Sequence, residues 1–112
     1  MMEITNFKEV QANNNPHGVD ARKIHENEDA QVIHILLKPG EKLKPHKTPV
    51  DVFFYVLEGN GMVQVGDEKM EVVKDDLIDS HKNILHCLFN ESEKDFRVLV
   101  VKTPTPNSLK NR

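Results

Sequence analysis

The sequence has one cysteine, no long apolar run and no excess of positive charge, and each shortage excludes a class of protein. A single cysteine, Cys87, cannot form an internal disulfide and fits a reducing compartment. No apolar stretch approaches the roughly 20 residues that cross a bilayer, and the first ten residues lack the apolar stretch of a signal peptide. We therefore expect a cytoplasmic protein.

The charge balance also narrows the expected partners. The chain carries 15 basic and 18 acidic residues, for a formal net charge of −3. This balance leaves no positive field for a phosphate backbone or anionic lipid, so neither nucleic acid nor a membrane is an expected partner. The length of 112 residues, 38% of them apolar, supports one domain with a modest core.

Helical periodicity is absent as well, and short apolar or alternating runs recur about every 8 to 12 residues. This spacing predicts an all-β sandwich or barrel. Gly66–Glu68 predicts a tight hairpin. We expect a core over residues 19–102, an N-terminal arm over 1–16 that packs on a neighbouring sheet, and a poorly ordered tail over 103–112. The predicted strands are 19–24, 30–37, 42–47, 52–57, 61–65, 69–73, 76–80, 86–90 and 95–102.

Histidine is the residue type that could carry chemistry, at positions 17, 25, 34, 46, 81 and 86. His17 and His25 lie in polar surroundings, and we interpret both as surface residues. His34 lies in the aliphatic run 32–37, where a polar ring needs a partner, and taken alone it favours a structural role. Strand alternation places His34 and Leu36 on one face and Ile33, Ile35 and Leu37 on the other.

Two motifs in the sequence resemble those of the cupin superfamily. Gly40, five residues and His46, followed by the segment 55–59 that ends in Glu-Gly, resemble the first motif. His86, three residues and Asn90 resemble the end of the second. The resemblance covers about residues 31–102 and implies a single-domain cupin of the conserved-barrel type. Its fold would be an RmlC-like double-stranded β-helix, or jelly-roll barrel.

The resemblance also implies a metal site, which this chain matches only in part. Cupin metals are held by two histidines and a glutamate of the first motif and one histidine of the second, a set that suits iron, manganese, nickel or zinc. His46 and His86 occupy two of the four positions, whereas Thr48 and Val52 replace the other histidine and the glutamate. Asp51, next to the glutamate position, has the wrong strand parity to substitute.

A third ligand could come from elsewhere in the chain. The cupin alignment points His34 into the barrel, so His34, His46 and His86 form a candidate three-histidine metal site. His81, at the expected barrel rim, is a further candidate. Without a third ligand, two imidazoles would bind a divalent cation weakly. The sequence therefore leaves two alternatives, a bound metal ion and a pocket without one.

The same alignment predicts the lining of a ligand pocket inside the barrel. This lining is mainly apolar, with imidazoles, hydroxyls and no evident inward arginine or lysine, and it suits a partly apolar or aromatic small molecule better than a sugar phosphate. The expected lining residues are His34, Leu36, His46, Thr48, Val52, Phe54, Ile78, Ser80 and His86.

Three functions follow as hypotheses. The first is a binding or sensing module that takes a small molecule without turnover, because two of the expected metal ligands are missing. The alternative is a metal-dependent enzyme of the dioxygenase or isomerase kind, using His46, His86 and a third histidine. The third is a structural domain that assembles through the outer face of the strand with Phe53. We also expect a homodimer, because short barrels gain core by pairing sheets or exchanging strands.

Overall fold

Residues 1–106, which the computed structural model describes, form nine strands and one short 3-10 helix. Every predicted strand is present, with ends that differ from the prediction by at most two residues. The elements are η1 (Phe7–Glu9), β1 (Asp20–Glu26), β2 (Gln31–Leu37), β3 (Lys42–His46), β4 (Asp51–Glu58), β5 (Asn60–Val65), β6 (Glu68–Val73), β7 (Leu77–Ser80), β8 (His86–Phe89) and β9 (Phe96–Thr103).

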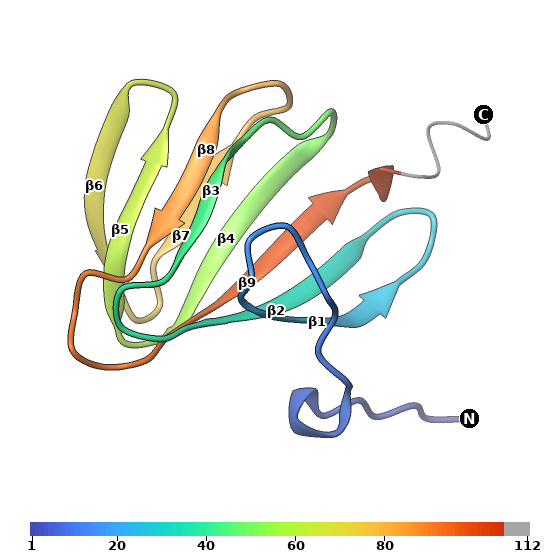
Figure 1. Ribbon diagram of the computed structural model, residues 1–112. Helices are drawn as coiled ribbons and strands as arrows, with labels where there is room; N and C mark the ends of the chain where they lie inside the picture. Colours follow the sequence, from blue (N-terminus) through green and yellow to red (C-terminus); the bar gives the residue numbers. More distant parts are fainter. Residues whose placement is uncertain (107–112) are drawn as a thin grey trace.

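The strands form two antiparallel sheets that face each other (Figure 1). One sheet has the order β1-β2-β9-β4-β7 and the other has the order β3-β8-β5-β6. The chain changes sheet at most of its connections; β1 and β2, and β5 and β6, are the consecutive pairs that stay in one sheet. Gly66 and Asp67 join β5 to β6 as the predicted hairpin, with Gly66 at a φ of +59°. This arrangement is the jelly-roll barrel that the cupin resemblance implied.

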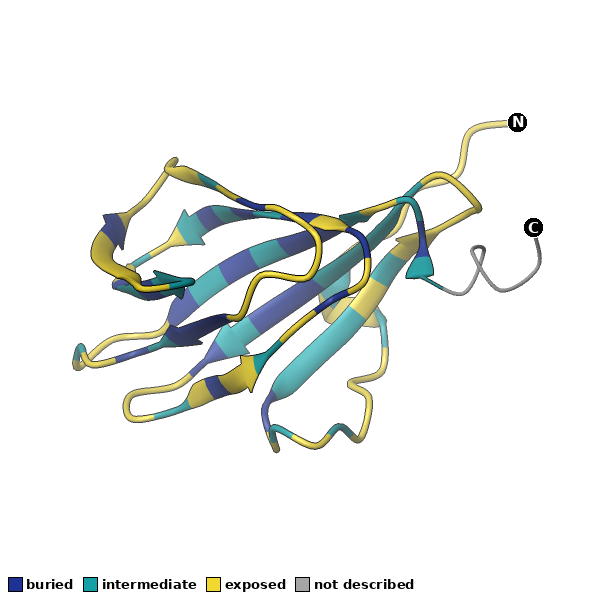
Figure 2. Cartoon of the chain, turned by 90° about the horizontal axis from the view of Figure 1, so that it is seen from above, coloured by how far each residue is buried: buried dark blue, intermediate teal, exposed yellow. Residues whose placement is uncertain are grey.

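The core lies between the two sheets and follows strand alternation. Val52, Phe54 and Val56 of β4 are each at most 4% exposed, whereas the residues between them are half-buried. Figure 2 shows the result as alternating bands of buried and intermediate residues along the central strands. On β9, Val98 and Val100 share the inward face with Phe54 across the sheet. This shared face points towards the β3-β8-β5-β6 sheet.

The N-terminal arm packs on the outer face of the larger sheet. Phe7 of η1 stacks on His34, with ring centroids 3.8 Å apart and planes 10° from parallel. The guanidinium groups of Arg22 and Arg97 lie 5.7 and 5.1 Å from the centre of the Phe7 ring. Nη1 of Arg97 donates a hydrogen bond to Nε2 of His34 at 2.9 Å. His34 therefore lies under the arm, on the side of β2 that faces away from the core.

The tail is ordered further than predicted. Thr103 is the last residue of β9, and Thr105 is buried, with its backbone N–H bonded to the carbonyl of Glu28 at 3.2 Å. Thr105 is thus packed against the β1–β2 connection, which corrects the expectation of a loose tail at this residue. The rest of that expectation falls on residues 107–112, outside the described part. A search of the described residues finds no helix long and apolar enough to cross a membrane.

Candidate functional site

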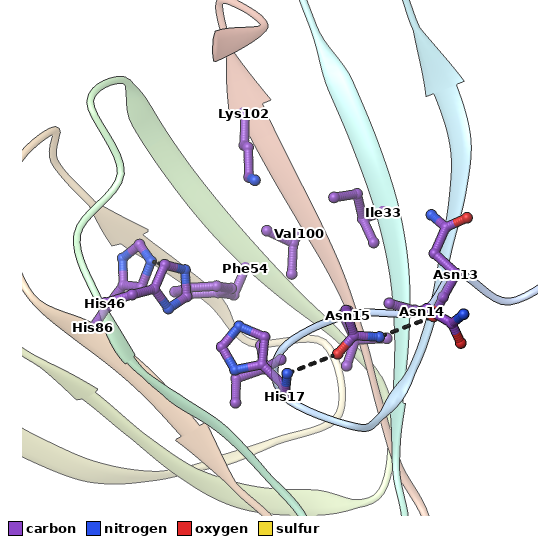
Figure 3. Close-up of a pocket in the computed structure, with 13 residues that line it drawn as sticks. Asn13, Asn14, Asn15, His17, Ile33, His46, Phe54, His86, Val100 and Lys102 are labelled. Atoms are coloured by element: carbon purple, nitrogen blue, oxygen red, sulfur yellow. Dashed lines mark hydrogen bonds between the residues drawn. The ribbon is translucent and has the colours of Figure 1, made fainter. Parts of the chain in front are cut away.

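A cavity of about 250 Å³ opens between the sheets at the mouth of the barrel, close to the lower limit of roughly 300 Å³ for small-molecule sites. Its apolar walls come from strands of both sheets, and the loop before β1 contributes Asn13, Asn14 and Asn15. Three histidines and one lysine provide its ionisable groups: His17, His46, His86 and Lys102. Figure 3 shows these residues converging from separate elements. The apolar residues are Ala21, Ile33, Ile35, Leu43, Phe54 and Val100.

His46 and His86 meet at one side of this cavity because β3 and β8 pair there. The two residues are register partners, and their Nε2 atoms lie 3.3 Å apart. His86 is 3% exposed and packs edge-on against the Phe54 ring, at a centroid distance of 5.2 Å. In this pair the His46 residue is half-buried and the His86 residue is buried.

The hydrogen-bond partners of these two rings determine their tautomers. Nδ1 of His46 lies 2.9 Å from the Lys44 carbonyl, which can only accept, so Nδ1 carries the proton and Nε2 holds a lone pair. Nε2–H of His86 then donates to Nε2 of His46, and Nδ1 of His86 accepts a hydrogen bond from the Ser80 hydroxyl at 2.8 Å. Thr48 Oγ1 lies 3.4 Å from Nε2 of His86. The neutral form of both rings satisfies this network.

Burial makes the neutral form of His86 the stable one. Desolvation, followed by the nearby His46 and Lys102, lowers the pKa of His86 from 6.5 to about 4. At neutral pH the ring is uncharged and its position is held by Ser80. It therefore adds no charge to the cavity.

His17 reaches the cavity on a hydrogen-bonded loop, although its polar neighbours predicted a surface position. The Asn15 side chain makes four hydrogen bonds, to the backbone of Asn13, His17 and Val19, and so closes the turn. Gly18 completes the turn at a φ of +68°. Nδ1 of His17 accepts the Lys44 backbone N–H at 2.8 Å, so the neutral ring carries its proton on Nε2. The Asn-rich segment indicated a turn at this place. The long-range hydrogen bond from Lys44 on β3 to His17 could not be predicted from local sequence.

Lys102 also corrects the expectation that no lysine faces inward. It follows Val98 and Val100 by strand alternation, and Figure 3 shows its side chain extending into the cavity. Desolvation lowers the pKa of Lys102. Its ammonium group contributes to lowering the pKa of both His17 and His86. The alternation of β9 was the signal that could have found it.

The structure brings together only part of the predicted pocket. His46, Phe54 and His86 line the cavity. Thr48 and Ser80 are buried beside His86, and Val52 belongs to the core. Ile78 instead lines a separate groove, together with residues of β5 and β6.

His34 and Leu36 were placed on the wrong face of β2. Both lie beneath the N-terminal arm, whereas Ile33 and Ile35 occupy the cavity wall. The alternation along β2 was predicted correctly, but the inward side was assigned from the cupin alignment. The aliphatic set Ile33, Ile35 and Leu37 faces inward because it buries more apolar surface there.

The residues present do not complete a metal site of the cupin kind. Within the described part of the chain, no three histidine, cysteine, aspartate or glutamate side chains are grouped to share an ion. His34 faces away, and His81 is exposed at the rim, where its Nδ1 lies 4.0 Å from Asp51. Asp51 points outward and accepts the Lys82 backbone N–H at 2.9 Å. Two imidazoles remain, whereas catalytic sites usually have three protein ligands.

Comparison with known proteins agrees with this fold. The protein TT1209 from Thermus thermophilus is 29% identical with a TM-score of 0.81, over 94% of this chain and 100% of that one. An RmlC-like cupin family protein from Methanocaldococcus jannaschii is 20% identical (TM-score 0.81; coverage 98% and 97%). KdgF from Halomonas sp. is 17% identical (TM-score 0.84; coverage 97% and 99%).

No curated protein matches the sequence significantly. The structural similarities at 20% and 17% identity support the fold and leave the activity open. The family model for the cupin domain matches residues 33–102, well over half of the chain. The chain therefore belongs to the cupin family.

Proposed function

We propose that this cupin binds a small organic molecule in the cavity at the barrel mouth, without a resident metal ion. The observation that carries the proposal is the cavity itself: apolar walls from both sheets enclose about 250 Å³, and a few polar groups converge on it. Concave, mostly apolar sites with a small number of placed polar groups are typical of ligand binding. The donor set supports the metal-free form, because the described residues contain no group of three histidine, cysteine, aspartate or glutamate side chains that could hold an ion.

The test is a fragment screen followed by two-dimensional NMR. We expect fragments to shift the methyl resonances of Ile33, Ile35 and Val100 and to raise the melting temperature, since a ligand of the folded state stabilises it. Ala21→Leu extends a side chain into the cavity and should abolish these shifts, whereas Ala12→Leu, on the exposed loop, should leave them unchanged. Absence of cavity shifts, or shifts that persist in Ala21→Leu, would overturn the proposal.

A metal-dependent enzyme of the dioxygenase or isomerase kind is the second candidate, and one distance favours it. Two nitrogens bound at 2.0–2.1 Å to one tetrahedral ion lie roughly 3.4 Å apart, close to the 3.3 Å between the two Nε2 atoms of His46 and His86. The centroid of the His17 ring lies 5.3 Å from that of His46, but within the described residues no three histidine, cysteine, aspartate or glutamate side chains are grouped to hold an ion. Elemental analysis of untagged protein decides between the candidates: one equivalent of metal that is lost in His46→Ala would favour the enzyme.

A further inference from the structure

The ionisable groups that line the cavity are all basic. Although the chain has 18 acidic residues, the cavity lining in the described structure contains no aspartate or glutamate. It contains Lys102 and three histidines instead. A cavity enclosed by low-dielectric walls concentrates the field of such groups, so it attracts a counter-ion of opposite charge. It also repels a free cation.

Lys102 supplies the positive charge of this lining, because the lowered pKa values of His17 and His86 leave both rings neutral at pH 7. Its ammonium group lies in the cavity, and within residues 1–106 it forms no hydrogen bond or ion pair. Burying a charged group without a partner costs free energy, as the lowered pKa of Lys102 indicates. A ligand that supplies a negative oxygen would offset this cost. The charge of Lys102 in the free protein therefore favours binding of an anion in the cavity.

His17 provides a second donor for the same oxygen-bearing group. Its Nδ1 is occupied by the Lys44 backbone N–H, so the ring nitrogen that remains free is Nε2, which bears the proton. The Asn15 side chain is used entirely within the loop, so His17 is the ionisable donor that the loop presents to the cavity, beside the amides of Asn13 and Asn14.

The remaining walls limit the size and type of the anion. Ile33, Ile35 and Val100 form an apolar surface beside Lys102, and the cavity measures about 250 Å³. One lysine without an arginine fits a singly charged group better than a phosphate dianion, which usually requires several charge-assisted donors. The apolar wall fits a short aliphatic or aromatic body. Together these features match a small organic monocarboxylate.

We propose that the cavity binds a small organic monocarboxylate, with its carboxylate paired to Lys102 and hydrogen-bonded to Nε2–H of His17, and its apolar body against Ile33, Ile35 and Val100. This inference rests on the proposed function, because it assumes that the cavity is a ligand site. It adds the charge and chemical class of the ligand. It also assigns a binding role to two residues outside the cupin motifs.

The experiment compares acids with their neutral amides. Benzoate and benzamide, and butyrate and butyramide, are titrated into the full chain at low ionic strength, with the Ile33 and Val100 methyl resonances as the readout. Charge-assisted hydrogen bonds are roughly twice as strong as neutral ones, so we expect each acid to bind at least about tenfold more tightly than its amide. Lys102→Met should remove this preference, and His17→Ala should weaken acid binding several-fold.

The matched control is Lys38→Met, which makes the same charge change at an exposed turn; it should leave both affinities within about twofold, because screened surface charges interact weakly. Equal affinity for acid and amide would overturn the inference and leave the proposed function standing. The inference also fails if Lys102→Met and His17→Ala both bind benzoate as the wild type does. If neither the acids nor the amides shift the methyl resonances, the monocarboxylate inference is overturned. The proposed function fails only if the neutral fragments of the screen also cause no shifts.

Discussion

The hydroxyl of Ser80 lies 2.8 Å from Nδ1 of His86, in a part of the barrel where both side chains are at most 3% exposed. β7 and β8 supply these residues from different sheets, so the bond links the two layers beside the cavity. The bond is compatible with the proton of the neutral ring on Nε2, the nitrogen that donates to His46. Ser80 therefore fixes the position of the His86 ring, whereas the Lys44 carbonyl, acting through His46, determines which nitrogen of His86 is the donor.

Removing this hydroxyl should destabilise the fold. Ser80→Ala leaves Nδ1 of His86 buried without a partner, and such a loss costs about 1–3 kcal/mol. Thr48→Val is the matched control, because the Thr48 hydroxyl lies 3.4 Å from His86 and its loss should cost less than about 1 kcal/mol. Urea unfolding at pH 7 measures both changes in the free energy of unfolding. Equal losses for the two variants would contradict the assigned network.

The stability of the protein should fall in mild acid because of His86. The pKa of this group drops from 6.5 in the unfolded chain to about 4 in the fold, so between these values the unfolded chain binds a proton that the folded chain does not. Stability is then complete above pH 6.5 and is lost as pH falls towards 4, by about 3 kcal/mol in total at 1.36 kcal/mol per pKa unit.

The comparison with His86→Gln isolates this contribution. Burial also lowers the pKa values of His17 and His34, so these groups act in the same direction in both proteins. Unfolding free energies at pH 7 and pH 4.5 should show a steeper loss for the wild type than for the variant. Parallel losses would show that His86 is not the responsible group.

The N-terminal arm should contribute measurably to stability through Phe7. Its ring stacks on His34 at a centroid distance of 3.8 Å and contacts two guanidinium groups, so Phe7→Ala should cost about 1–2 kcal/mol. Phe7→Leu keeps much of the apolar burial but loses the stacking, and it should fall between the wild type and the alanine variant. Thermal unfolding ranks the three proteins. An unchanged melting temperature for Phe7→Ala would mean that the arm is not docked in solution.

The free protein should become more stable when the charge at position 102 is removed. Lys102→Met keeps an unbranched side chain in the cavity and relieves the desolvation of the ammonium group, so we expect a gain of about 1 kcal/mol. Lys38→Met, at its exposed turn, should change stability by less than about 0.5 kcal/mol. Urea unfolding in the absence of carboxylates checks the difference. A loss of stability in Lys102→Met would show that this charge has a partner in the free protein.

The homodimer that we expect from the size of the barrel stays a prediction. Sedimentation velocity over a concentration series measures it directly. A species of twice the 12.8 kDa chain mass is the expected result, and a monomer at all concentrations would contradict it.

The strands, and the alternation of more and less buried residues along them, were predictable from local sequence patterns. Alternation along β4 predicted that Val52, Phe54 and Val56 share a face, and turn residues such as Gly66 marked the ends of neighbouring strands. The motif spacing also placed His46 and His86 together. These properties depend on residues close in sequence, or on a spacing that one family of folds preserves.

The face of a strand that points inward is a different kind of property. Strand alternation separates His34 from Ile33 and Ile35, but only packing against the second sheet decides which set is buried in the core and which lies under Phe7. The same holds for the ends of the chain. Thr105 was predicted to belong to a loose tail, and its burial depends on the contact with Glu28 across the β1–β2 connection.

The sequence by itself determined the fold class, the nine strands and the resemblance to the cupin motifs, in which Thr48 and Val52 stand where that resemblance expects metal ligands, because each of these depends on residue type and spacing. Only the tertiary structure decided that His17 and Lys102 share one cavity with His46 and His86, and that His34 does not. The physical reason is the long-range hydrogen bond from Lys44 to His17 and the mutual burial of two sheets, which join residues from opposite ends of the chain.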